Sequence, residues 1–224
     1  MNRANMTNFM IRIDSGNENW FRISEQDNIF DNLNKTLYFF KKARKDNSFW
    51  KWVIVAFHSA LYGSMLLALR RTDLSNIWER EIRDTKNHIN IKKSRLISFF
   101  KAFEWIQDDQ RMQKYVKSKS FKLVDQNLKD SIVSLNNEFR NQFLHYKPLG
   151  WSIEKEALRE VVRDCLPLIE FLLFQSGNIA IERDQKNQAK EVTAQIRNFV
   201  RKSKSQKGTE NNIEELKQIY FKPM

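Results

Sequence analysis

Residues 49–69 are apolar on nearly every side, and this feature constrains the fold more than any other part of the chain. A helix that is hydrophobic all round belongs in a protein core or in a membrane. The inner part, residues 52–69, is almost long enough to span a bilayer, but it contains His58, and the basic residues at both ends give no orientation signal. Small residues that favour close helix packing recur along it: Ala56, Ala60 and Gly63. We therefore predict the central buried helix of a bundle, with no membrane association.

Turn-forming residues are scarce elsewhere, since only 5 Gly and 3 Pro occur in 224 residues. Apolar residues at helical spacing dominate instead, which favours an all-α class. We expect an up-and-down bundle of about four to six helices. Besides residues 49–69, the predicted helices run from a cap at Ser24 to the basic residues 41–45, over about 94–117, over about 122–146, from Ser152 to Gly177, and over 181–204 as an exposed helix. The polar residues 72–93 are expected to form a loop with a short helix.

The chain is predicted to have one main domain with an extension at each end. Residues 1–23 contain two short apolar runs and suggest an extended arm or a hairpin. Residues 24–177 hold the helical domain, and residues 178–224 form a basic C-terminal extension that includes a short terminal helix. The single Cys165 lies among apolar residues, which indicates a core position and a reducing, cytoplasmic setting.

Polar residues line one side of the predicted helix 122–146, next to its apolar face. That face is formed by residues at spacings of three and four: Leu128, Ile132, Leu135, Phe139 and Phe143. Beside it, Asn137, Asn141 and His145 stand one turn apart, and Arg140 follows Asn137 by three residues. A base, a cation and two amides are thus predicted to share one stripe of the helix.

The pattern Arg-Asn-x-x-x-His, from Arg140 to His145, resembles the Arg-x(4–6)-His motif of HEPN domains. These are small all-α modules of many prokaryotic RNases, toxins and phage-defence proteins. The resemblance extends to the order of elements over about residues 24–177. It implies an HEPN-like helical bundle that forms a homodimer with the two motifs face to face, and a metal-independent endoribonuclease site without a cofactor. Some members have Tyr two residues after the His, whereas here Lys147 is there and Tyr146 is adjacent to His145.

RNA cleavage without a metal requires proton transfer at the 2′-hydroxyl and at the leaving oxygen, and a cation for the phosphate. Histidine exchanges protons near neutral pH, and a guanidinium grips phosphate oxygens with two hydrogen bonds. His145 and Arg140 are therefore the predicted catalytic pair, with Asn141 and Asn137 as predicted substrate-binding residues. The alternative for the pair is a structural role, because Arg and His also suit a helix C-terminus. His58 is predicted to be a hydrogen-bonded core residue, with a second catalytic group as the alternative.

The motif is short, and Arg83 and His88 repeat its spacing in a polar stretch with little periodicity, which we interpret as coincidence. A net charge of +12 favours a polyanionic partner, and RNA is the expected one. An antitoxin or other regulatory protein is a further partner that the family resemblance implies. Two other interpretations stay open: a non-catalytic helical module that binds RNA, a nucleotide or a protein, and a helix-turn-helix DNA-binding protein.

Overall fold

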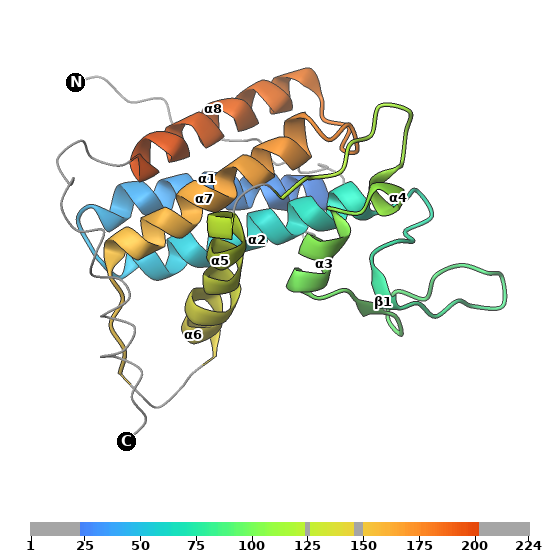
Figure 1. Cartoon of the computed structure of the whole chain (residues 1–224), viewed down its shortest axis with the longest axis horizontal. Coiled ribbons are helices and arrows are strands. Elements are labelled where there is room, and N and C mark those ends of the chain that lie inside the picture. The colour runs from blue at the N-terminus through green and yellow to red at the C-terminus, as the bar shows by residue number, and fades with distance from the viewer. Residues whose placement is uncertain (1–22, 124–125, 146–149, 202–224) are drawn as a thin grey trace, which may run out of the picture.

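The computed structural model describes residues 23–123, 126–145 and 150–201. The predicted arm before Ile23 and the predicted terminal helix lie outside the described residues. The described chain is mostly helical, with one small two-stranded sheet, so the all-α class is confirmed. Four long helices run side by side along the longest axis of the molecule (Figure 1): α1 (Glu25–Ala43), α2 (Phe49–Leu69), α7 (Lys155–Phe174) and α8 (Arg183–Val200).

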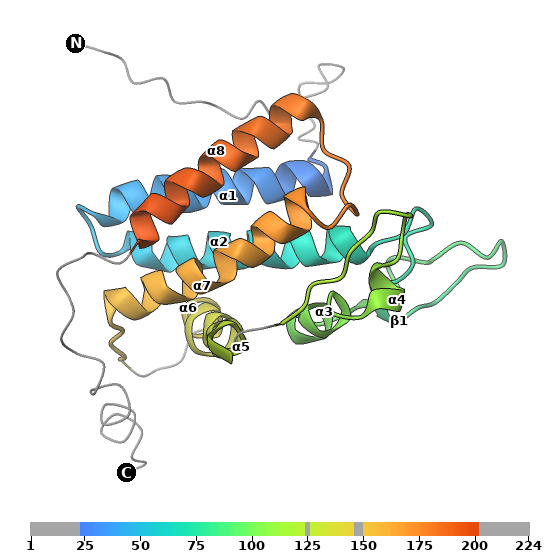
Figure 2. The ribbon, with the colours of Figure 1, turned by 45° about the horizontal axis from the view of Figure 1, so that its top comes forward.

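The helices are stacked in three layers, as Figure 2 shows. Helices α1 and α8 form one outer layer, and α2 and α7 form the middle one. The other outer layer holds α3 (Phe99–Trp105) and a rod that consists of α5 (Gln126–Val133), η1 (Ser134–Arg140) and α6 (Asn141–Leu144). The rod crosses α2 and α7 steeply and contacts both (Figure 1). Every layer thus touches the apolar α2 or a helix packed on it.

Helix α2 is the central buried helix that the sequence predicts, with the predicted bounds. Its side chains Val53, Phe57 and Leu61 are fully buried. A Cβ atom on Gly63 would lie 2.9 Å from Ile29 Cγ1 of α1, so a glycine is needed for this close helix contact. Within the described residues, α2 is long and apolar enough to cross a membrane, but 61% of that window is buried inside the bundle, as expected for a core helix.

Helix α1 begins as predicted at Ser24. The Ser24 side chain accepts a hydrogen bond from Asp27 N at 3.0 Å, and Asp27 Oδ2 accepts one from Ser24 N at 3.2 Å. This reciprocal capping box satisfies two backbone donors that the first helical turn leaves unpaired. Helix α7 begins two residues later than expected, because Glu154 rather than Ser152 occupies its N-cap position.

The prediction for residues 72–117 is wrong in two respects. Residues 72–93 contain no helix and instead enter a hairpin in which β1 (Trp78–Arg80) pairs antiparallel with β2 (Arg95–Leu96). The expected long helix over 94–117 is replaced by β2, α3 and a short α4 (Asp109–Met112). Polar side chains break it, since Ser98 caps α3 and Asp108 caps α4 by accepting backbone hydrogen bonds inside the predicted helix.

Helix α8 was expected to be exposed, and this is also wrong. Val192, Ile196 and Val200 are buried against the bundle, and α8 packs on both α1 and α7. Phe199 stacks on Phe40 of α1 with ring centroids 5.7 Å apart. Most residues of α8 are polar, so its narrow apolar stripe was not recognised in the sequence. This stripe is enough to attach the helix to the core.

Replacing Ile196 with Ala should lower the free energy of unfolding by about 2 to 5 kcal/mol, because a fully buried side chain is truncated. The control is Asn198→Ala on the exposed side of the same helix, with an expected change within about 0.5 kcal/mol. Urea unfolding followed by circular dichroism measures both. Equal effects of the two substitutions would show that α8 does not pack as described.

Candidate active site

The rod that carries the motif is built as one helix with a π-helical segment in its middle. The predicted apolar face is confirmed, since Leu128, Ile132, Leu135 and Phe139 are buried, and Phe143 packs partly buried against the core. In η1 the backbone is wider than an α-helix, and Asn141 N donates to Asn136 O, five residues back. π-helical turns often occur at functional sites. Here the turn ends at Arg140, within the predicted catalytic motif.

The extra residue of the π turn changes which side chain faces the bundle. Asn136 rather than Asn137 turns toward α2, where His58 Nε2 lies 3.0 Å from Asn136 Oδ1. Asn137 is exposed, and its Oδ1 accepts a 2.9 Å hydrogen bond from Asn136 Nδ2. The contact between Asn136 and His58 is therefore one that regular helical spacing in the sequence did not predict.

Arg140 lies at a cavity of about 280 Å³ between the rod, α1 and α2. It is partly buried, and its Nη1 donates to Asn141 Oδ1 at 2.8 Å. The lining of the cavity combines polar and apolar side chains: Asn28, Val55, His58, Ser59, Tyr62, Gly63, Leu66, Arg140 and Leu144. Asn141 thus holds the guanidinium in position, and its predicted role in substrate binding stays a prediction.

Arg140 differs from the other partly buried arginines of the described chain. Arg70, Arg111, Arg159 and Arg163 each lie within 4.0 Å of at least one carboxylate. No carboxylate of a described residue lies within that distance of Arg140. A charge that is partly removed from water normally has an ionic partner. The guanidinium of Arg140 therefore keeps donors available for an anionic ligand.

His145 lies at the end of the rod, just beyond Leu144. Its backbone has left the helix, with φ −102° and ψ 113°, and its N–H donates to Asn141 O at 2.9 Å. The residue is exposed and does not line the Arg140 cavity. Among the described residues, no hydrogen bond joins its ring to Arg140. The structure thus places the predicted pair at one end of the rod, with Arg140 at the cavity and His145 at the surface, while Tyr146 lies outside the described residues.

His58 is a buried, hydrogen-bonded histidine, as predicted, but it also lines the cavity. Its ring stacks on Phe99 with centroids 4.5 Å apart. Burial lowers the pKa of His58 from 6.5 to about 4, the hydrogen bond to Asn136 opposes this, and the charge of Arg140 lowers the pKa further. The ring is therefore neutral at pH 7. In the sequence, the feature that points to a cavity at this position is a histidine followed by the small Ser59 within an apolar helix.

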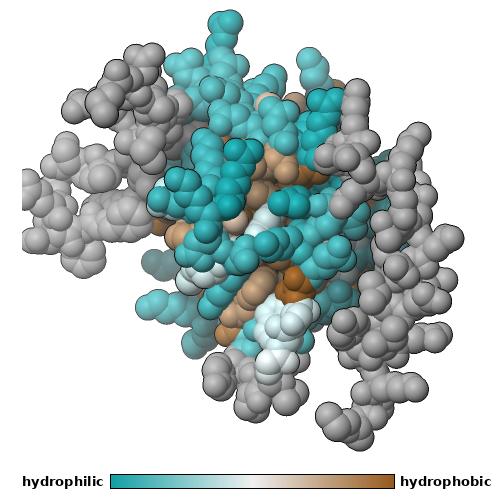
Figure 3. Space-filling model, turned by 90° about the vertical axis from the view of Figure 1, so that its left-hand side faces the viewer, coloured by the Kyte–Doolittle hydropathy of each residue, from teal (hydrophilic) through white to brown (hydrophobic). Residues whose placement is uncertain are grey.

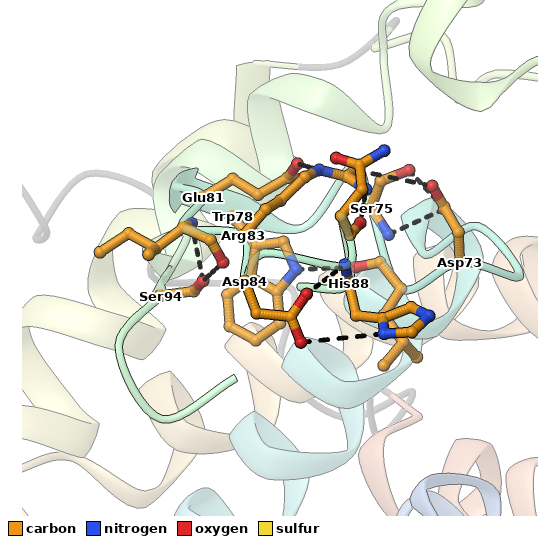
Figure 4. Close-up of polar contacts among 11 residues, drawn as sticks. Asp73, Ser75, Trp78, Glu81, Arg83, Asp84, His88 and Ser94 are labelled. Atoms are coloured by element: carbon orange, nitrogen blue, oxygen red, sulfur yellow. Dashed lines mark hydrogen bonds and ion pairs between the residues drawn. The ribbon is translucent and has the colours of Figure 1, made fainter. Parts of the chain in front are cut away.

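Arg83 and His88 have the same sequence spacing but a different setting (Figure 4). Both belong to the hairpin region, where Asn87 adopts a positive φ of 63°. Arg83 pairs with Glu81 at 2.7 Å, and His88 Nδ1 lies 3.8 Å from Asp84 Oδ2. Neither residue lines the Arg140 cavity. The spacing alone thus does not produce the arrangement seen on the rod.

The described residues contain no cluster of three His, Cys, Asp or Glu side chains that could hold a metal ion. Cys165 is buried in α7, and burial raises its pKa well above the ordinary value, so its thiol is protonated at neutral pH. Nucleophilic chemistry by this thiol is therefore disfavoured.

No protein-family model matches the chain, and no curated protein or solved structure is significantly similar to it. The side chains themselves must therefore support any assignment of function.

Acid should destabilise the protein through His58. Its folded-state pKa is depressed, so between pH 6.5 and pH 4 the unfolded chain binds a proton that the folded chain excludes. The stabilising contribution is complete above pH 6.5 and is lost as the pH falls to about 4, with a total of about 3 kcal/mol. Urea unfolding at pH 7 and pH 4 should show a smaller loss for His58→Gln than for the unchanged chain. If both proteins lost the same free energy of unfolding between pH 7 and pH 4, the lowered pKa of His58 would be contradicted.

Proposed function

We propose that the protein is a metal-independent endoribonuclease of the HEPN type. The observation that carries this proposal is Arg140, a partly buried guanidinium beside a cavity with no carboxylate partner among the described residues. Such a group is suited to a phosphodiester, because it donates two parallel hydrogen bonds and stays charged at every physiological pH. The net charge of +12 adds attraction for RNA that does not depend on sequence.

In the proposed reaction, Arg140 binds the scissile phosphate and Asn141 holds the guanidinium in place. His145 takes the proton from the 2′-hydroxyl, whose oxygen attacks phosphorus as the bond from phosphorus to the 5′-oxygen breaks. The departing 5′-oxygen receives a proton from the motif histidine of a second copy of the chain, which leaves a 2′,3′-cyclic phosphate and a 5′-hydroxyl. The exposure of His145 suits a polymeric substrate, since a long RNA strand reaches a surface group more easily than a group inside a closed cavity.

One protomer offers only one motif histidine for two proton transfers, so we propose a homodimer in which the motifs of both copies face one RNA phosphate. Large apolar side chains near the motif support a contact surface, because 39% of Val133 and 44% each of Leu144 and Trp151 are exposed. Val133 and Leu144 belong to the rod, and Trp151 packs on Phe143 with ring centroids 4.9 Å apart. Burial of these groups would favour association.

A non-catalytic module that binds RNA, a nucleotide or a protein is the second candidate. It is favoured by the separation of the two motif side chains, since Arg140 contacts the cavity and His145 does not. Arg140 would then hold an anion without any reaction. RNA cleavage by the purified protein in EDTA separates the two candidates.

Replacing His145 or Arg140 with Ala should reduce RNA cleavage in EDTA by about a hundredfold or more, because proton transfer or phosphate binding is lost. The fold should survive. His145 is exposed, so its loss should change the free energy of unfolding by only about 0.5 kcal/mol, and loss of the Arg140 hydrogen bond should cost about 1 kcal/mol. A gel assay with labelled RNA measures the cleavage rate.

The matched controls for these variants are His88→Ala and Arg83→Ala, which remove the same residue types at the same spacing outside the rod. They should cleave at the normal rate. If His145→Ala unfolds the protein, the motif has a structural role; if it folds and cleaves normally, the assigned site is wrong.

The proposed dimer should be visible by sedimentation at micromolar concentration. Val133→Asp should shift the protein toward monomer and lower cleavage together, because a charge would enter the apolar contact at a residue that does not line the Arg140 cavity. Ile91→Asp, the same kind of apolar-to-acidic change on the exposed hairpin region, is the control and should change neither quantity. A strict monomer with full nuclease activity would rule out a site shared between two copies.

A further inference from the structure

Most of the lining of the Arg140 cavity is uncharged. Arg140 is the one charged group among its nine lining residues, since the ring of His58 is neutral. Another cavity, of about 450 Å³, lies at the end of the bundle that Figure 3 shows, where hydrophobic side chains are bordered by hydrophilic ones. That cavity is lined by several Lys and Arg side chains, and it shares no lining residue with the Arg140 cavity. The Arg140 cavity therefore differs in offering mainly neutral groups to a ligand.

The hydrogen bond between His58 and Asn136 determines which ring nitrogen of His58 carries the hydrogen. Asn136 Nδ2 donates to Asn137 Oδ1 at 2.9 Å, so the amide oxygen of Asn136 faces His58, 3.0 Å from Nε2. An amide oxygen can only accept, so Nε2–H of His58 is the donor. A neutral imidazole has a single N–H, which leaves Nδ1 of His58 as an acceptor with a lone pair.

This acceptor has no partner in the described part of the chain. No hydrogen bond joins Nδ1 of His58 to any described residue, although only 6% of the residue is exposed. Buried polar atoms nearly always have a hydrogen-bond partner, and an unpaired one lowers stability. Because His58 lines the cavity, a ligand bound there can supply the missing N–H or O–H donor.

Ser59 supplies a second unpaired group beside His58. Elsewhere in α2, the hydroxyl of Ser64 donates to the carbonyl oxygen of Ala60, four residues back, at 2.7 Å. The hydroxyl of Ser59 makes no such bond to any described residue, and Ser59 lines the cavity as a half-buried residue. The cavity thus presents an acceptor from His58 and a donor from Ser59 side by side.

The cavity lies between a face of α2 and a face of the rod. On α2 its lining residues recur at spacings of three and four, which places them on one helix face: Val55, Ser59, Tyr62 and Leu66. On the rod, Arg140 and Leu144 stand one turn apart. Aliphatic side chains therefore line the cavity from both helices, and a space of this kind suits a flat ring whose polar edge meets His58 and Ser59.

We propose that the cavity selects the base next to the scissile phosphate, and that it prefers adenine or cytosine. This inference rests on the proposed function, in which Arg140 holds that phosphate beside the cavity. The amino group of adenine or cytosine projects from the ring and donates to the buried Nδ1 of His58, and the adjacent ring nitrogen accepts from Ser59. Uracil and guanine have a carbonyl oxygen at the projecting position, which the lone pair of Nδ1 repels.

The selected base belongs to the nucleotide on the 3′ side of the scissile phosphate. In the proposed reaction His145 acts on the 2′-hydroxyl of the nucleotide on the 5′ side, and His145 lies outside the cavity at the surface. Arg140 binds the phosphate between the two nucleotides. The nucleotide inside the cavity is therefore the one that departs with the 5′-oxygen.

Dinucleoside monophosphates test the proposal, because they have one phosphate and Arg140 thus fixes their register. With the full chain as the His145→Ala variant, which binds without cleavage, UpA should bind about tenfold more tightly than its isomer ApU, since only UpA has adenine on the 3′ side. Replacing that adenine with purine, which lacks the amino group, or with 1-deazaadenine, which lacks the ring acceptor, should each weaken binding about fivefold or more. Titration followed by NMR measures these affinities.

Substitutions in the same variant connect each base atom to one side chain. His58→Phe should reduce the preference for adenine over purine to less than about twofold, and Ser59→Ala should do so for adenine over 1-deazaadenine. Ser59 loses no hydrogen bond to a described residue, so Ser59→Ala gives a result even if His58→Phe fails to fold. The matched controls are His88→Phe in the hairpin region and Asn198→Ala in the second cavity, which should keep both preferences.

Equal affinity for UpA and ApU would overturn the proposal, and so would no binding of either at millimolar concentration. A preference for adenine that survives both His58→Phe and Ser59→Ala would also overturn it. The nuclease is judged separately, by cleavage of longer RNA in EDTA with the unchanged chain. Cleavage without preference for adenine or cytosine on the 3′ side would refute base selection alone, whereas selective binding of UpA by a chain that does not cleave RNA would support base selection and refute the nuclease.

Discussion

The fold depends on the burial of α2, whose apolar side chains point in nearly every direction. A helix of this kind cannot lie on a surface, so it must be covered on several sides at once. Helices α1, α7, α3 and the rod supply this cover. The same requirement brings the rod against α2, so that the placement of Arg140 beside His58 is a result of core packing.

The rod must satisfy two requirements on the direction of its side chains, which a regular helix does not satisfy together. Its apolar residues must face α7 and α2, while its polar residues must reach the cavity and the surface. The π turn lies between the two parts, since Leu128 and Ile132 before it are buried, whereas Leu144 and His145 at the end of the rod are exposed. The contact between Asn136 and His58 holds the turn against α2 at the point where the helical pattern changes.

Apolar periodicity along the sequence correctly predicted the elements whose position is determined by burial in the core. The bounds of α2, the Ser24 cap of α1 and the buried face of the rod follow from burial and local capping, which sequence patterns record directly. The break over residues 94–117 was missed because its cause is local, in the caps at Ser98 and Asp108, while the aromatic residues favoured one helix. The π turn and the pairing of Asn136 with His58 depend on contact between distant segments, which spacing within one helix cannot reveal.

The π turn also determines how the site is oriented relative to the rest of the chain. A regular helix advances about 100° per residue, so one additional residue rotates everything after it relative to everything before it. Removal of a single codon from residues 134–140 would keep Leu128 and Ile132 in the core and turn Arg140 and His145 to a new direction. The orientation of the site therefore depends on the number of residues in the turn as well as on their identity.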